Sequence, residues 1–232
     1  MTTTTSAERS NGAVRDPIWL FSKAVLLPIL YGPLRMRRAG MGNLPRTGTV
    51  LLVCNHVSVV DPVALTVAAR PRRVRMMAMV ELFRIPVLGA YVRRMGAFPV
   101  MRDSADHGAM RTARQLLAEG ECVVVFPEGR VSRGGIMRPG SPGVGALALL
   151  PGVTVVPAAV WNTQLMRGPV RVRFGPPVDL SGLPDGGPRS ARARAATERI
   201  MAALAELVPQ VGGPAQPAPG CTPTAAERAA SV

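Results

Sequence analysis

The chain has 232 residues, of which 47% are hydrophobic, so it is long and apolar enough to fold around its own core and global disorder is excluded. Its 28 lysines and arginines outnumber its 14 aspartates and glutamates, which gives a formal net charge of +14. A surface this basic attracts phosphate groups of nucleic acid, anionic lipid or a small substrate. Aromatic residues make up only 4% of the chain, which argues against a nucleic-acid-binding module with interleaved basic and aromatic side chains.

Residues 1–15 and 209–232 have the composition of disordered tails, and the main domain is expected at residues 39–208. Residues 16–38 contain an apolar stretch followed by arginines. The stretch is shorter than the roughly 20 apolar residues that a spanning helix needs. Its aromatic and basic side chains favour a helix lying in a membrane interface, and a helix packed on the core is the alternative.

The cysteines and the N-terminal sequence favour a reducing compartment. Cys54, Cys122 and Cys221 are widely spaced, and the first two lie in apolar runs, so neither a disulfide framework nor a metal site is expected. The first residues lack the charged-then-apolar order of a secretory signal. Together with the segment at 16–38, these features predict a peripheral or monotopic protein on the cytoplasmic face of the cell membrane.

Short β-rich runs alternate with helical patterns along the rest of the chain. Strands are expected at residues 49–54, 98–100, 122–126, 154–160 and 170–174, with a further apolar run at 74–80. Helices are expected at 62–69, at 82–95 with a bend or restart at Pro86, and at 103–119, 146–150 and 189–207, with a glycine-rich loop at 129–145. Strands separated by helices predict one α/β domain whose sheet is covered on both sides.

His56, one of two histidines, directly follows the predicted strand at 49–54, and Asp61 lies five residues after it. Open α/β sheets place reactive groups in the loop after a strand's carboxyl end. A neutral imidazole can take a proton from a hydroxyl, while a carboxylate fixes its tautomer and stabilises the imidazolium. Apart from Ser58 no protein nucleophile accompanies the pair, which favours a base acting on a bound hydroxyl over a serine hydrolase. For a lone histidine, a packed or capping role is the alternative; the other histidine, His107, is expected at the surface.

Four sequence blocks resemble those of the glycerolipid acyltransferases, the family of 1-acyl-sn-glycerol-3-phosphate acyltransferase. They are Asn55-His56-x-Ser58-x-x-Asp61, Glu81-Leu82-Phe83 followed by Gly96 to Arg102, Phe126 to Arg133 with Gly135, and Val155 to Val160. Their order and their spacing between residues 55 and 160 both resemble the family's.

The resemblance implies a role for each matching residue. His56 would be the general base for an acceptor hydroxyl that attacks a thioester carbonyl, with Asp61 orienting it. Arg102 matches the family's phosphate-binding arginine, whose planar fork suits a phosphate. Glu128 and Gly129 match positions that hold the glycerol portion and shape the site.

Asn55, Ser58 and Pro157 match supporting positions, and two further positions depart from the family's common pattern. The third block commonly reads Glu-Gly-Thr-Arg-Ser, whereas here the arginine has moved one place earlier, to Arg130. Met79 stands where the second block often has a lysine. These departures leave the implied acyl-transfer residues in place and put the acceptor in doubt, with Arg130 or Arg133 expected to reach the acceptor's phosphate.

The resemblance therefore implies a single-domain acyltransferase with a mixed central sheet flanked by helices. It would move a fatty acyl group from acyl-CoA or acyl-carrier protein to the free hydroxyl of 1-acyl-sn-glycerol-3-phosphate, giving phosphatidic acid in phospholipid biosynthesis. No cofactor, metal or nucleic acid is expected, and the expected partners are an anionic membrane surface, a lysophospholipid acceptor and the acyl donor. The alternatives are another acceptor (a lysophospholipid, glycerol-3-phosphate or another alcohol or amine) and a non-enzymatic basic lipid- or nucleic-acid-binding module. The sequence does not indicate the oligomeric state.

Overall fold

The computed structural model describes residue 32 and residues 35–101, 107–132, 134–164, 168–184 and 188–217. Over these residues the chain forms a seven-stranded sheet in the order β1-β7-β6-β2-β5-β3-β4. The strands are β1 (Arg37–Ala39), β2 (Val50–Cys54), β3 (Arg75–Met79), β4 (Ala97–Val100), β5 (Cys122–Val125), β6 (Thr154–Trp161) and β7 (Arg171–Phe174). The five strands from β6 to β4 are parallel, whereas β7 is antiparallel to β6 and β1 is parallel to β7. The predicted mixed α/β sheet is confirmed.

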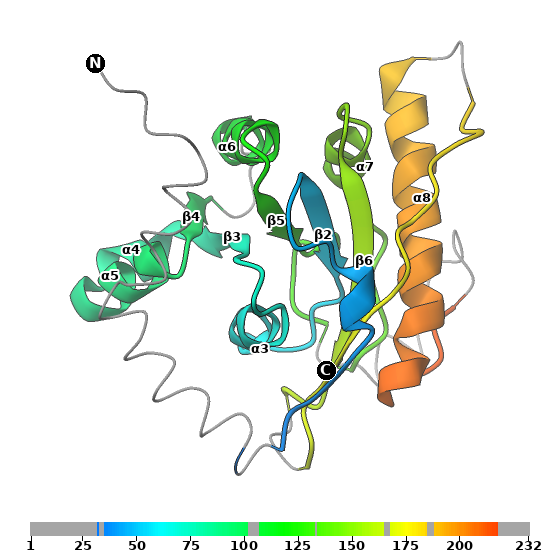
Figure 1. Cartoon of the computed structure of the whole chain (residues 1–232). Coiled ribbons are helices and arrows are strands. Elements are labelled where there is room, and N and C mark those ends of the chain that lie inside the picture. The colour runs from blue at the N-terminus through cyan, green and yellow to red at the C-terminus, as the bar shows by residue number, and fades with distance from the viewer. Residues whose placement is uncertain are drawn as a thin grey trace, which may run out of the picture.

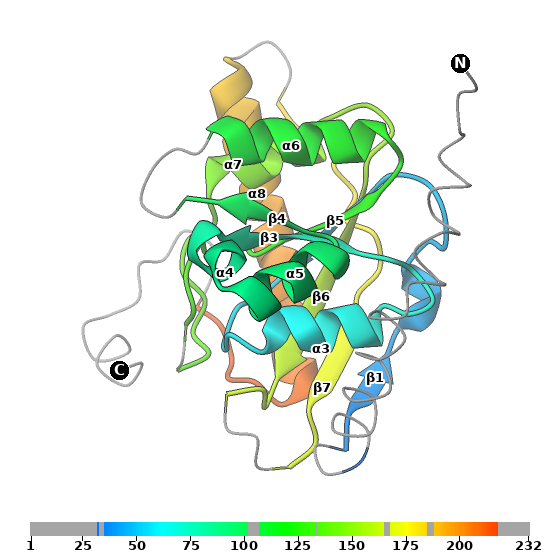
Figure 2. The same ribbon diagram turned by 90° about the vertical axis from the view of Figure 1, so that its left-hand side faces the viewer.

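Helices cover both faces of the sheet, as the sequence predicts. They are α3 (Asp61–Ala68), α4 (Val80–Arg84), α5 (Pro86–Arg94), α6 (His107–Ala118), α7 (Pro142–Ala148) and α8 (Arg189–Leu207), with short 3-10 helices η2 (Met41–Asn43) and η3 (Pro209–Val211). In Figure 1, α3 lies on one side of the sheet and α7 and α8 on the other, while α4 and α5 lie beside the β3–β4 end. Figure 2 shows α3 and α6 on opposite sides of the strands.

Strand β2 lies at the centre of the core, and all five of its residues are fully buried. Leu52 belongs to the apolar cluster that includes Leu65 of α3. Its neighbour Leu51 belongs to the opposite cluster, which includes Leu147 of α7 and Leu204 of α8. A strand buried on both faces has a continuous apolar sequence, which explains the VLLVC pattern.

Two neighbouring strands send the chain to opposite faces of the sheet. Strand β2 leads into α3 on one face, and its neighbour β5 leads through a long loop into α7 on the other. The connections therefore diverge at the carboxyl ends of β2 and β5. In open α/β sheets such a switch point leaves room for a ligand.

The predicted strands are present to within one residue at each end, and the apolar run at 74–80 contains β3. The helix predicted at 62–69 is α3, and the predicted restart at Pro86 separates α4 from α5. The helix predicted at 103–119 is observed as α6, and residues 103–106 lie outside the described part of the chain. The last helix has the predicted bounds.

Helix α7 begins earlier than predicted. The glycine-rich sequence predicts a loop over residues 129–145, yet α7 starts at Pro142. Ser141 caps the helix by accepting a hydrogen bond from the backbone of Gly143, and proline suits the first helical position. A β-carbon at Gly145 would lie 1.9 Å from the carbonyl oxygen of Ala193, so glycine there allows α7 to pack closely against α8.

Two terminal expectations differ from the structure. Arg37 and Arg38, expected at the end of a membrane-interacting segment, are part of β1, and the Arg38 guanidinium donates to the carbonyl of Arg70. Residues 209–217, expected in a disordered tail, include η3, and the Gln216 side chain binds the backbone of Met137. Such hydrogen bonds between distant residues leave no local sequence pattern.

Residues 1–31, which contain the predicted N-terminal tail and the apolar stretch, lie outside the described residues. None of the helices in the described ranges is long and apolar enough to cross a membrane.

Candidate active site

His56 and Asp61 meet just beyond the carboxyl end of β2. Their contact joins His56 Nδ1 to Asp61 Oδ2 at 2.8 Å. The Asp61 side chain is fully buried, whereas 14% of the His56 side chain is exposed. Because a carboxylate only accepts hydrogen bonds, the neutral ring carries its proton on Nδ1 and keeps a lone pair on Nε2. This is the arrangement of a general base.

Four donors hold the Asp61 carboxylate. Besides the His56 ring, the backbone N–H groups of Val57 and Ser58 donate to Oδ2 at 2.7 and 2.8 Å. Thr163, which follows β6, donates its hydroxyl to Oδ1 at 2.5 Å. Asp61 is also the first residue of α3, where the helix dipole favours a negative charge. The buried carboxylate is thus fully hydrogen-bonded and held in a fixed orientation.

Thr163 is a site residue that no sequence pattern predicts. It lies 102 residues from Asp61 and outside the four sequence blocks. The parallel pairing of β6 with β2 brings the ends of these strands together. A polar side chain just after β6 could have indicated a site residue, but only if β6 were already known to lie next to β2.

Glu128 links the loop after β5 to the loop that carries His56. Its Oε1 accepts from the His56 backbone N–H at 2.8 Å, while Oε2 accepts from the Ser132 hydroxyl and, at 3.1 Å, from the Arg138 backbone. Burial raises the pKa of the Glu128 carboxyl above its usual range, and these hydrogen bonds oppose the rise. The resemblance assigned Glu128 to the glycerol portion of the substrate, whereas the observed contacts position His56.

An aromatic ring packs on the candidate base. The rings of His56 and Phe126 are stacked, with centroids 4.1 Å apart and planes at 21°. The backbone N–H of Ser132 donates to the His56 carbonyl at 2.6 Å. Backbone contacts on one side and a ring on the other thus limit the orientations that the imidazole can adopt.

Of the predicted phosphate-binding arginines, Arg130 lies within the described part of the chain. Arg102 and Arg133 lie outside the described residues. Arg130 is exposed, directly after the turn in which the Gly129 N–H donates to the carbonyl of Phe126 at 3.1 Å. Gly129 has φ +66°, a backbone conformation that glycine adopts without strain.

Asn55 joins two strand ends. Its side-chain amide donates to the carbonyl of Val160 at 3.0 Å and its oxygen accepts from the Val160 N–H at 2.8 Å. Asn55 is fully buried, so these bonds fix the backbone immediately before His56. Ser58 accepts from the N–H of Val60 at 3.2 Å and shapes the turn that leads to Asp61.

Pro157 lies within β6, in register with Val53 of β2. It lies one residue before Ala158, where the pairing of β6 with β7 begins, and its carbonyl accepts from the Gly175 N–H at 2.8 Å. A proline is tolerated there because it lies outside the antiparallel ladder that would use its N–H. The structure places Pro157 in the sheet below the site.

The buried thiols are poor nucleophiles. Burial raises the pKa of the Cys122 thiol to about 12, and the pKa of the Cys54 thiol is raised by burial and then by the nearby Asp61 and Glu128 carboxylates. Within the described ranges, no three His, Cys, Asp or Glu side chains are grouped so that they could hold a metal ion.

The fold and the site define an α/β enzyme with its polar groups at a switch point of the sheet. More particularly, the chain belongs to the Acyltransferase family, whose profile matches residues 35–161, and it is an acyltransferase. That range contains all four blocks on which the family resemblance rests.

The 1-acyl-sn-glycerol-3-phosphate acyltransferase of Bacillus subtilis is 29% identical over 167 residues, which cover 68% of this chain and 82% of that protein. The enzyme of the same name from Borreliella burgdorferi is 30% identical over 128 residues, and the match covers half of that protein. The crystal structure of the 1-acyl-sn-glycerophosphate (LPA) acyltransferase, PlsC, from Thermotoga maritima has the same fold, with a TM-score of 0.57 and 24% identity over 87% of both chains.

Proposed function

We propose that the protein transfers a fatty acyl group from a thioester of coenzyme A or acyl-carrier protein to the free hydroxyl of 1-acyl-sn-glycerol-3-phosphate, giving phosphatidic acid. The observation that supports this most strongly is the 2.8 Å contact between His56 Nδ1 and Asp61 Oδ2, which leaves Nε2 as a base. The names of the related enzymes suggest the acceptor.

The proposed reaction balances without a protein nucleophile. His56 Nε2 takes the hydroxyl proton as the acceptor oxygen attacks the thioester carbonyl carbon, and Asp61 stabilises the imidazolium. The tetrahedral intermediate then collapses: the new C–O ester bond remains, the C–S bond breaks, and the imidazolium proton passes to the leaving sulfur. The chemistry uses no cofactor and no metal ion.

The remaining predicted residues have binding or supporting roles in this proposal. Arg102, by its match to the family, and Arg130, by its position after the Gly129 turn, would bind the acceptor's phosphate. Glu128 would keep the His56 backbone in place through its 2.8 Å hydrogen bond. Asn55 would hold the same loop from the β6 side.

A lipid acceptor implies reaction at a membrane. The formal net charge of +14 favours an anionic surface, and we expect peripheral binding at the cytoplasmic face of the cell membrane. Flotation with vesicles should recover the protein with anionic lipid and much less of it with neutral lipid. Equal recovery with both would contradict an electrostatic contribution.

A second acceptor class is favoured by two sequence departures. The arginine of the third block is at Arg130, and Met79 replaces a lysine that is frequent in the second block. Both departures concern the acceptor, so a lysophospholipid with a larger headgroup is the second candidate.

The deciding experiment is an acceptor panel with one labelled acyl-CoA and one labelled acyl-carrier protein. Full-length protein would be mixed with vesicles containing 1-acyl-sn-glycerol-3-phosphate, a lysophospholipid with a larger headgroup, or neither, and with glycerol-3-phosphate in solution. We expect labelled phosphatidic acid as the main product. Transfer mainly to another acceptor would replace the proposed substrate, and no transfer to any acceptor would overturn the proposed function.

A further inference from the structure

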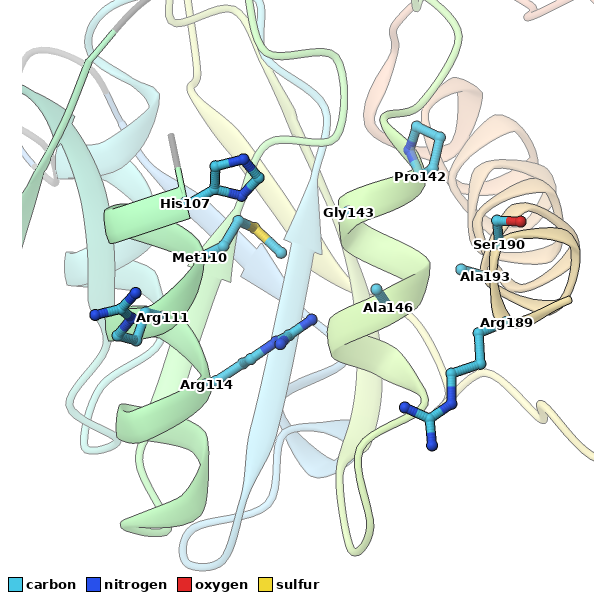
Figure 3. A pocket seen from close by; sticks show the side chains of 10 residues that line it. All are labelled: His107, Met110, Arg111, Arg114, Pro142, Gly143, Ala146, Arg189, Ser190 and Ala193. Carbon is cyan, nitrogen blue, oxygen red and sulfur yellow. The ribbon is translucent and has the colours of Figure 1, made fainter. Parts of the chain in front are cut away.

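Away from the candidate active site, helices α6, α7 and α8 border an open hollow of about 610 Å³ on one face of the molecule, which we call the basic groove. Its lining residues are His107, Met110, Arg111, Arg114, Pro142, Gly143, Ala146, Arg189, Ser190 and Ala193 (Figure 3). Pockets of about 300–1,000 Å³ hold small molecules, so the groove has a suitable size.

Arginines are the charged residues of the groove's lining, as far as the structure describes it. Arg111 and Arg114 come from α6 and Arg189 from α8, and no aspartate or glutamate is among the lining residues. Figure 3 shows Arg114 reaching from α6 toward α7, with Arg189 on the far side of α7. In the part of the chain that the structure describes, none of these three guanidinium groups has an ion pair or a hydrogen bond. Like charges that line one hollow favour an anion that neutralises them.

Small residues keep the groove open. Gly143 and Ala146 of α7 and Ala193 of α8 lie in its lining. A β-carbon at Gly143 would lie 3.3 Å from Met110 Cε, so a larger residue at this position would crowd Met110 and narrow the groove. Small apolar residues between arginines suit a ligand with both a ring and phosphates.

One end of the groove adjoins the loop that builds the active site. The N–H of Ser141, the cap of α7, donates to the carbonyl of Pro127 at 2.9 Å. Pro127 lies between Phe126, which stacks on His56, and Glu128, which binds the His56 backbone. A ligand in the groove that also reaches His56 needs a long, flexible arm next to its charged part.

Coenzyme A thioesters have this construction: phosphates on a nucleotide, then a flexible pantetheine arm that ends at the thioester. We infer that the basic groove binds the phosphate-bearing nucleotide of the acyl-CoA donor, with the arm crossing the Pro127–Ser141 loop toward His56. This inference rests on the proposed acyl transfer. The size of the groove favours a nucleotide over the broad acidic surface of a carrier protein.

The test measures binding apart from turnover. Calorimetric titration of the full-length protein with coenzyme A is compared with titration by pantetheine, which lacks the nucleotide. We expect Arg114→Gln and Arg189→Gln each to raise the Kd for coenzyme A about fivefold, as for loss of one partly solvated phosphate contact, without changing pantetheine binding. The matched control is Arg194→Gln, which removes the same charge from an exposed position of α8 outside the groove.

A variant that leaves the charge unchanged provides a second test. Ala146→Leu adds volume inside the groove, and leucine is well tolerated in a helix, so this variant should also weaken coenzyme A binding several-fold. If the wild type prefers coenzyme A no more than pantetheine, or if Arg194→Gln acts as strongly as the groove variants, the inference is wrong.

Kinetics distinguish the two donors. If the groove variants raise KM for acyl-carrier protein but leave KM for acyl-CoA unchanged, the groove binds an acidic protein and the inference is overturned. If coenzyme A binding responds as expected but no acceptor is acylated, the proposed function fails while the groove's ligand is supported.

Discussion

The Thr163 hydroxyl donates a 2.5 Å hydrogen bond to Asp61 Oδ1, while the His56 ring donates to Asp61 Oδ2. Thr163 and Asp61 are both buried. The carboxylate is thus held from two sides by residues of two different strand ends. The Thr163 hydroxyl donates to Asp61, and the proposed reaction gives Thr163 no contact with the substrate. It acts through Asp61 as a positioning residue.

Thr163→Val should reduce kcat with little change in KM for either substrate, because it leaves one Asp61 oxygen buried without its donor. The unsatisfied carboxylate should also cost about 1–3 kcal/mol of unfolding free energy. Thr163→Ser keeps the hydroxyl and should restore most of kcat. Thr66→Val, which removes a hydroxyl bonded within α3, is the control. A raised KM with unchanged kcat would contradict the positioning role.

Asn55→Leu should destabilise the protein, because it removes both hydrogen bonds to Val160 in a fully buried place. Two backbone groups lose their partners, which predicts a loss of about 2–5 kcal/mol in urea unfolding. Equal stability of the leucine variant and the wild type would show that the two hydrogen bonds between Asn55 and Val160 contribute nothing to the unfolding free energy.

Glu128 predicts a dependence of stability on pH. Its pKa is raised by burial above the ordinary 4.5, so the folded state holds a proton that the unfolded state releases. The stabilisation from protonated Glu128 is complete below the unfolded pKa and is lost as pH rises through the folded pKa. Relative to Glu128→Gln, the wild type should therefore lose unfolding free energy as pH rises from about 4 toward neutrality. A constant difference between the two proteins across this range would contradict the raised pKa.

Gly145→Ala should open the contact between α7 and α8, since the new β-carbon would lie 1.9 Å from the carbonyl oxygen of Ala193. Overpacking of this kind costs about 1–3 kcal/mol, measurable as a lower midpoint of thermal unfolding. Gly42→Ala is the matched control, because no atom lies within 4 Å of its added β-carbon. The prediction is wrong if both variants unfold alike.

Much of the fold could be predicted from local sequence. The unbroken apolar run of β2 indicates a strand buried on both faces, and Pro86 marks the restart between two helices. Strand β1 could not be predicted, because three residues that pair with β7 leave no periodic signal. The glycines around Pro142 are typical of a loop, so the helix start there was not predicted, although Ser141 and Pro142 together form a capping signal.

Local sequence likewise predicts only some of the contacts in the site. His56 and Asp61 lie five residues apart, so the sequence could predict that they meet. The partners of Asp61 and Glu128 depend on long-range pairing: Thr163 arrives through the register of β6 with β2, and the Arg138 N–H through the path of the loop after β5. Neither contact could be read without the strand order.

The most direct test of the proposed base is kcat for acyl transfer to 1-acyl-sn-glycerol-3-phosphate by His56→Ala, with Arg194→Gln as the control. Arg194 is exposed on α8 and lies outside the basic groove. Loss of a general base predicts a fall in kcat of about 10²–10⁴-fold in the first variant, measured where thermal unfolding shows it to be folded, and near-normal kcat in the second. A His56→Ala enzyme that is folded and retains kcat within a few-fold of the wild type would contradict the account.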